Sequence, residues 1–155
     1  MRGFTLIELT ACLLIIAVLA ALLGPRFTGT QPFDQRGYAD ELAAALRYAD
    51  DLAVATGCNV SFTVTAVPAQ YSAAMRAAAG NTCAAAGAYG QNVLWPDGTP
   101  LSGSPPSDAN VTRAGTIVFG AAGQVVSWSH ALPASFTIGT FTLTVDSSSG
   151  FVNVQ

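Results

Sequence analysis

An unbroken apolar run near the start of the chain limits what this sequence can fold into. The run extends from Phe4 to Gly24, reads FTLIELTACLLIIAVLAALLG and contains one charged residue, Glu8. At a helical rise of about 1.5 Å per residue it forms a helix of about 31 Å, the thickness of the apolar core of a bilayer. We therefore expect residues 4–24 to form a membrane-spanning helix and residues 25–155 to form one globular domain.

Three kinds of segment have such a composition, and Glu8 distinguishes them. A secretory signal peptide would use Arg2 as its basic start and be cut near Ala20. A plain membrane anchor is the second kind, and neither of these two explains an ionisable residue that costs about 2.5–3.5 kcal/mol near the centre of the span. The third is the assembly helix of a filament subunit, in which cleavage after Gly3 frees the amine of Phe4. In a filament, Glu8 would neutralise the amine of a neighbouring subunit.

The residues around this site support the third interpretation. The segment Gly3–Leu9, GFTLIEL, resembles the cleavage and methylation motif of type IV pilins and type II secretion pseudopilins. The resemblance implies that residues 1–3 are a leader, that prepilin peptidase cuts after Gly3 and N-methylates Phe4, and that Glu8 sets the registry between subunits. It also implies partners: other pilin or pseudopilin subunits, an inner-membrane assembly platform and, before assembly, inner-membrane lipid.

Turn-forming residues follow the apolar run. Gly24 and Pro25 stop or bend the helix, since proline lacks a backbone donor. Arg2 predicts a cytoplasmic N-terminus, which places the residues after Pro25 in the periplasm or at the cell surface. Residues 27–37 contain two glycines and a proline, and we expect a break or hinge there.

A second helix is predicted over Tyr38–Thr56, with Gly57 as its C-terminal cap. Its apolar residues recur at spacings of four and three, which is typical of a helix that packs one stripe against a sheet. The members of the stripe are Tyr38, Leu42, Ala45, Ala49 and Leu52. The charged residues lie off the stripe, and we interpret them as a solvated face. They are Asp40, Arg47, Asp50 and Asp51.

The rest of the chain is rich in short β-type runs between turn signals. We predict loops over residues 79–91 and 103–110. The expected strands are residues 60–67, 70–76, 116–120, 124–128, 135–138, 141–146 and 151–154. A long helix, part membrane-spanning and part amphipathic, packed on an antiparallel β-sheet head makes an α+β, pilin-like fold.

The later segments extend the resemblance over nearly the whole chain. The helix segment LRYA, the glycine-rich FGAAG and the terminal SGFV look, in that order, like the minor pseudopilin H and FimT-type family, and most like minor pilins of MSHA-type (mannose-sensitive haemagglutinin) pili. The resemblance implies a minor pilin that starts assembly or lies at the filament tip. A minor pseudopilin of type II secretion is the alternative.

Cys58 and Cys83 lie in the exported part, where an oxidising compartment permits a disulfide between them. Two buried free thiols remain the alternative, and Cys12 is most simply a small apolar residue of the span. A metal site is not expected, since His130 is the single histidine and no CxxC spacing occurs. We expect no cofactor.

Two other function classes are disfavoured. His130 could be drawn as a hydrolase triad with Ser127, Ser129 and Asp146, but only composition supports that grouping. No GxSxG motif or phosphate-binding loop occurs, so we expect no enzyme activity. A DNA-uptake receptor would need clustered basic residues. The part after Gly24 instead has five dispersed arginines, no lysine and eight acidic residues, so nucleic acid is not an expected partner.

Overall fold

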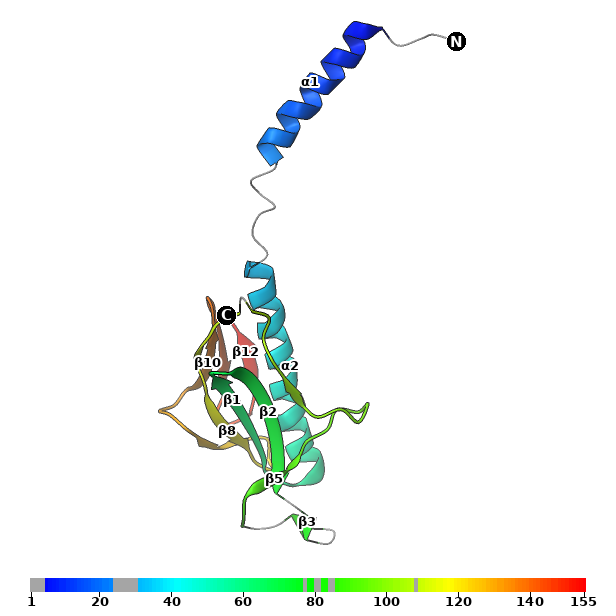
Figure 1. The fold of residues 1–155 in the computed structure, drawn as a ribbon. Coiled ribbons are helices and arrows are strands. Elements are labelled where there is room, and N and C mark those ends of the chain that lie inside the picture. The colour runs from blue at the N-terminus through cyan, green and yellow to red at the C-terminus, as the bar shows by residue number, and fades with distance from the viewer. Residues whose placement is uncertain (1–4, 24–30, 77, 80–81, 84–85, 108) are drawn as a thin grey trace. The chain divides into compact units, whose positions relative to one another are not determined.

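The structure is a computed structural model that describes residues 5–23, 31–76, 78–79, 82–83, 86–107 and 109–155. The chain divides into two compact units, residues 1–32 and residues 33–155. Each unit is described by itself, and the second, called the head below, contains the sheets (Figure 1).

The first helix, α1, extends from Leu6 to Leu23. Thr5 caps its N-terminus, because the amide of Glu8 lies 3.3 Å from Thr5 Oγ1 and 3.1 Å from the Thr5 carbonyl oxygen. Every side chain described here, from Thr5 to Ala20, is exposed. In the described part of the chain, no helix is both long enough and apolar enough to cross a membrane.

The second helix, α2, extends from Gln31 to Thr56, so the break expected over residues 27–37 is wrong from residue 31 onward. Pro32 lies in the first helical turn, where its missing N–H would have no partner in any case. Gly37 is accommodated within the helix, at a cost of about 1 kcal/mol relative to alanine. The C-terminal end is as predicted: α2 ends at Thr56, and Gly57 follows with φ +66°.

The strands form two antiparallel sheets and a short ribbon, so the α+β class is confirmed (Figure 1). The larger sheet has the order β5-β2-β1-β8-β9, with β6 also paired to β2. Its strands are β1 (Val60–Ala66), β2 (Ala69–Arg76), β5 (Tyr89–Asn92), β6 (Ser102–Gly103), β8 (Gly115–Phe119) and β9 (Val125–Trp128). The second sheet has the order β12-β11-β10-β7. Its strands are β7 (Val111–Arg113), β10 (Ala134–Ile138), β11 (Phe141–Val145) and β12 (Val152–Val154).

The single sheet expected from the sequence is therefore replaced by two. The expected loop over residues 79–91 also contains structure: β3 (Ala78–Ala79) and β4 (Thr82–Cys83) pair as a ribbon, and β5 begins at Tyr89. These strands, and β6 and β7, have two to four residues each, which is too short for an alternating pattern to show.

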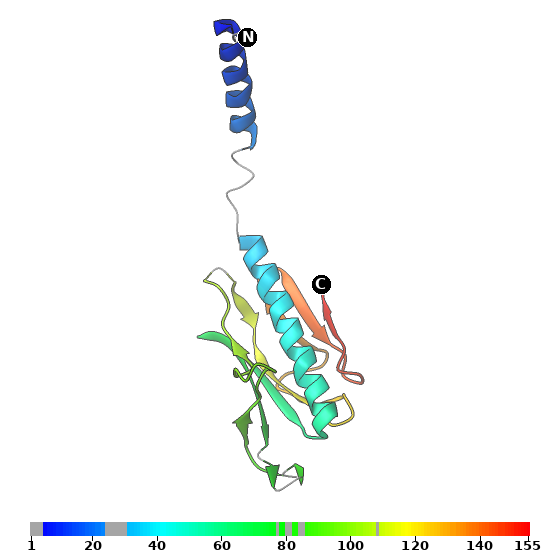
Figure 2. The same cartoon turned by 90° about the vertical axis from the view of Figure 1, so that its right-hand side faces the viewer.

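Helix α2 lies across both sheets and closes the core of the head (Figure 2). The predicted stripe is confirmed: Tyr38, Leu42, Ala45 and Ala49 are buried, and Leu52 is partly buried. Three fully buried phenylalanines of the strands belong to the same core. They are Phe62 in β1, Phe119 in β8 and Phe136 in β10. Burial of this apolar surface is the main source of stability for the head.

A polar contact fastens α2 to the larger sheet. The Tyr71 hydroxyl of β2 donates to Glu41 Oε1 of α2 at 2.7 Å. Burial of Tyr71 and its bond to Glu41 raise the pKa of the phenol well above its usual value. Gly103 of β6 leaves room for this pair, since a Cβ there would lie 2.6 Å from the Tyr71 ring and 2.7 Å from Glu41 Oε1.

We predict that Tyr71→Phe lowers the free energy of unfolding by about 1 kcal/mol, because it removes one charge-assisted hydrogen bond. Chemical denaturation of Tyr71→Phe, Glu41→Gln and the double variant would measure the coupling between the two side chains. Additive effects, with no coupling energy, would show that the contact contributes nothing to stability.

Candidate assembly site

The candidate assembly site is the first turn of α1, where Glu8 lies. Its side chain is exposed, and no residue of the described chain bonds to its carboxylate. Thr5 and Glu8 have the T-x-x-E spacing of a capping box. A negative charge in the first turn also interacts favourably with the helix dipole. Local helix chemistry is thus one explanation of Glu8 that does not require a second subunit.

The predicted processing site and the predicted helix break lie outside the described residues. Gly3 and Phe4 precede the first of them, and Gly24 and Pro25 fall between the two helices. Cleavage after Gly3, methylation of Phe4 and the helix break at Gly24 and Pro25 therefore stay predictions.

In the head, Cys58 and Cys83 form a disulfide bond, with their Cα atoms 5.5 Å apart. Cys58 follows the end of α2, and Cys83 lies in the β4 strand of the ribbon. The bond therefore ties the ribbon to the end of the helix. Cys12, on α1, is a free, exposed thiol.

The residues that could be drawn as a hydrolase triad have separate hydrogen-bond partners. His130 Nε2 lies 2.8 Å from the Ala114 carbonyl oxygen, and Ser129 Oγ accepts from the Thr116 amide at 3.0 Å. The Asp146 carboxylate accepts instead from Ser148 and Ser149 in its own turn. These contacts explain the residues as parts of turns and strand ends.

The arginines of the described head are spread over three elements: Arg36 and Arg47 lie on α2, Arg76 on β2 and Arg113 on β7. Arg36 pairs with Asp40 and lies 5.5 Å from the centre of the Phe141 ring. Arg47 donates to the Val152 carbonyl oxygen, and Arg76 lies over the Tyr89 ring. A continuous basic surface for phosphate binding does not arise from residues placed this way.

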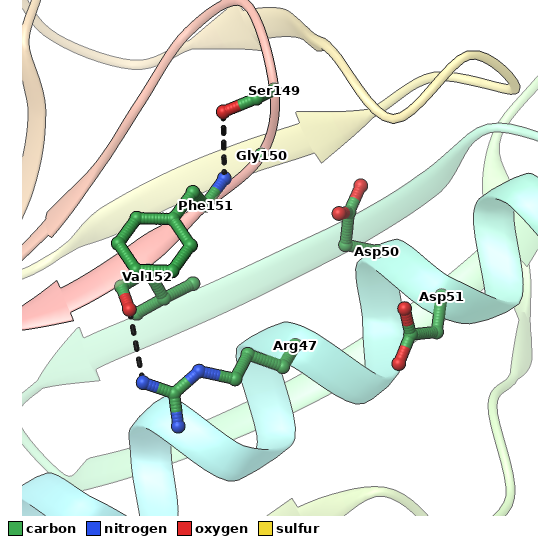
Figure 3. A pocket seen from close by; sticks show the side chains of 7 residues that line it. All are labelled: Arg47, Asp50, Asp51, Ser149, Gly150, Phe151 and Val152. Carbon is green, nitrogen blue, oxygen red and sulfur yellow. Dashed lines mark hydrogen bonds between the residues drawn. The ribbon is translucent and has the colours of Figure 1, made fainter.

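A second candidate site is an open pocket of about 540 Å³ between α2 and the β11–β12 turn, which comprises residues 147–150. Figure 3 shows the Arg47 guanidinium and the Phe151 ring at one side of it and Asp50 at the other. Its lining residues are Arg47, Asp50, Asp51, Ser149, Gly150, Phe151 and Val152. The Arg47 guanidinium donates to the Val152 carbonyl oxygen at 2.9 Å.

Asp50 departs from the solvated face that the sequence analysis predicted. Its Oδ1 atom is buried and has no hydrogen-bond partner among the described residues. Burial, and secondarily the charge of Asp51, raise the pKa of Asp50 to about 6. Arg47, Asp40 and Asp51 are exposed, as expected. The glycines of the FGAAG and SGFV segments were a signal for this site, because Gly123 and Gly150 both have positive φ and lie close to Asp50.

We predict that Asp50→Asn stabilises the head at pH 7.5 and not at pH 3.5. When folding raises the pKa of an acid, the free energy of unfolding falls as the pH rises from about 4 to about 6. Above pH 6 the full decrease in stability persists. Because the carboxyl is partly exposed, we expect a gain of about 1 kcal/mol at pH 7.5. Denaturant unfolding at both pH values measures it, and an equal effect at both would refute the assignment to ionisation.

The family described as type II transport protein GspH matches residues 38–155. The chain belongs to this family, whose members are structural pseudopilin subunits rather than enzymes. Comparison with curated proteins and with solved structures found no match.

The family match begins at Tyr38, a buried residue of α2, and covers all of the head except its first five residues. The resemblance to minor pseudopilin H that the sequence analysis noted is confirmed. Family membership implies interaction with other pilin or pseudopilin subunits of a type II secretion or type IV pilus-like system.

Proposed function

We propose that the protein is a minor pilin that assembles through α1 into a type IV pilus of the MSHA type, at the start or tip of the filament. Prepilin peptidase removes residues 1–3 and methylates Phe4. The segment 4–24 then holds the subunit in the bacterial inner membrane, with its N-terminus cytoplasmic, until an assembly platform moves it into the filament. The head faces the periplasm and later the cell surface.

The observation that carries this proposal is the apolar surface of α1. The side chains described from Leu6 to Ala20 are exposed, and they include Ile7, Leu13 and Ile16, at 76%, 58% and 61% exposure. Such a surface needs an apolar environment, because leaving it in water forgoes about 25 cal/mol for each Å². Lipid supplies that environment before assembly, and the helices of neighbouring subunits supply it afterwards.

Glu8 is the polar exception on this surface. In a filament, we propose that its carboxylate pairs with the methylated amine of Phe4 from a neighbouring subunit, which sets the axial registry. A paired charge is tolerated in a low-dielectric core, whereas a single buried carboxylate tends to take up a proton. The capping role of Thr5 is compatible with this pairing, since it uses the Glu8 amide and leaves the carboxylate available.

A minor pseudopilin of type II secretion is the second candidate function, because the matching family carries that description. Both functions use the same helix and the same processing. They differ in the destination of the assembled subunit: a surface pilus extends beyond the cell, whereas a pseudopilus remains in the periplasm.

Mechanical shearing of cells that express the protein distinguishes the two. Recovery of the subunit in sheared surface filaments supports the pilus proposal. Retention in the cell, together with loss of exported proteins when the gene is deleted, supports the secretion function. Recovery as a processed monomer that enters no filament in either setting would refute both.

A further inference from the structure

The β11–β12 turn crosses directly over a carboxyl group of α2. Gly150 has φ +66°, a conformation that favours glycine, and a Cβ at this position would lie 2.5 Å from Asp50 Oδ2, so any other residue would also require the carboxyl to shift. Asp50 Oδ1 is buried without a hydrogen-bond partner among the described residues. Figure 3 shows the carboxyl beside the turn, on the side away from the Arg47 guanidinium.

The turn is held together by its own hydrogen bonds. Asp146 Oδ1 accepts from the amides of Ser148 and Ser149, each at 3.0 Å, and from their hydroxyls at 2.6 and 2.9 Å. The Gly150 amide donates to the Asp146 carbonyl oxygen at 3.0 Å. None of these bonds involves Asp50. One bond ties the turn to β9, from the Val125 amide to the Ser147 carbonyl oxygen at 2.9 Å, and it has to break when the turn lifts.

The charged groups around Asp50 do not neutralise it. On α2, Asp51 adds a like charge, and the Arg47 guanidinium donates to the Val152 carbonyl oxygen across the pocket. On the turn, the hydroxyls of Ser148 and Ser149 lower the pKa of Asp146 to about 2, so Asp146 stays ionised above pH 4. The β8–β9 connection, residues 120–124, and strand β12 contain no ionisable side chain.

We propose that Asp50 is a pH-dependent switch: its neutral carboxyl tolerates the β11–β12 turn closed over α2, and its ionisation lets the turn lift and widens the pocket beside Phe151. Ionisation places a negative charge where one oxygen is buried and has no donor among the described residues. Lifting the turn lets water reach both oxygens. The raised pKa of Asp50 places the change between about pH 5 and pH 7.

Hydrogen exchange of the full-length protein in detergent micelles tests this inference. We would measure protection factors, corrected for intrinsic exchange, at pH 5 and pH 8 for peptides that cover residues 146–152. With a pKa of 3.8 in the open state and about 6 in the closed state, linkage limits the loss of protection to about tenfold. Peptides of strand β1 in the same sample report global unfolding and should keep their protection.

Two variants sharpen the test. Asp50→Asn removes the charge at nearly constant shape, and its turn should keep the pH 5 protection at pH 8. Asp51→Asn is the matched control. Its turn should still lose protection as the pH rises, but at a lower midpoint pH, because the Asp51 charge that raises the Asp50 pKa is removed. The inference is overturned if the wild-type turn has equal protection at both pH values, or if Asp50→Asn loses protection as the wild type does. The wild-type comparison with β1 does not depend on the folding of either variant.

Discussion

Replacing Glu8 with alanine is expected to lower incorporation of the subunit into filaments about a hundredfold while leaving its processing intact. The variant would leave the amine of a neighbouring subunit buried and unpaired, which costs about 3–5 kcal/mol. Since about 1.4 kcal/mol corresponds to a factor of ten, the loss amounts to two or more orders of magnitude. The ratio of filament-bound to membrane-bound subunit, determined by immunoblotting, measures it.

Glu8 also lies in the first turn of α1, so its charge must be separated from its role in the helix cap. Glu8→Gln keeps a residue that is suitable for a capping box but removes the charge, and it should be as defective as the alanine variant. Thr5→Ala removes the hydroxyl that lies 3.3 Å from the Glu8 amide and keeps the carboxylate. It should cost only about 1 kcal/mol of helix stability and leave incorporation largely intact. If Glu8→Gln is incorporated normally and Thr5→Ala is not, Glu8 acts through the helix cap instead.

The second large effect is expected from loss of the disulfide. Cys58 and Cys83 are 25 residues apart, and closing a loop of that length stabilises a protein by about 3.5 kcal/mol in the chain-entropy treatment. Replacing both cysteines with serine should therefore lower the Tm by roughly 10 °C. Calorimetry of the oxidised protein and the double variant provides the measurement.

Cys12→Ser is the control for this comparison, because Cys12 is a free thiol. It should leave the Tm unchanged, and a reducing agent should lower the Tm of the wild type but not that of the double-serine variant. If reduction leaves the wild-type Tm unchanged, the bond does not stabilise the head.

The sequence predicted the parts of the fold that depend on long, regular patterns. The stripe from Tyr38 to Leu52 continues over four turns, and it is buried as the spacing requires. The long alternating runs of β1 and β11 were also visible. The start of α2 could not be predicted, because proline and glycine, here Pro32 and Gly37, are common where helices break. The helix accommodates Pro32 only because this residue lies in its first turn.

The division into two sheets and the pocket at Asp50 depend on contacts between segments far apart in the chain. β7 has three residues, and it joins the second sheet only because β10 pairs with it. Asp50 has the spacing of a solvent-facing residue on α2, and the β11–β12 turn, about a hundred residues later, covers it. No local pattern in either segment contains that information, although the glycine at position 150 marks a close backbone approach.

Intact-mass analysis and N-terminal sequencing of the membrane-extracted protein, with and without a co-expressed prepilin peptidase, test the assembly account most directly. The account predicts a chain that begins at N-methylated Phe4 when the peptidase is present and at Met1 when it is absent. A chain that begins near Ala21, or that keeps Met1 beside an active peptidase, would contradict it. The apolar helix would then be an export signal or a plain anchor, and Glu8 would have no neighbouring amine to pair with.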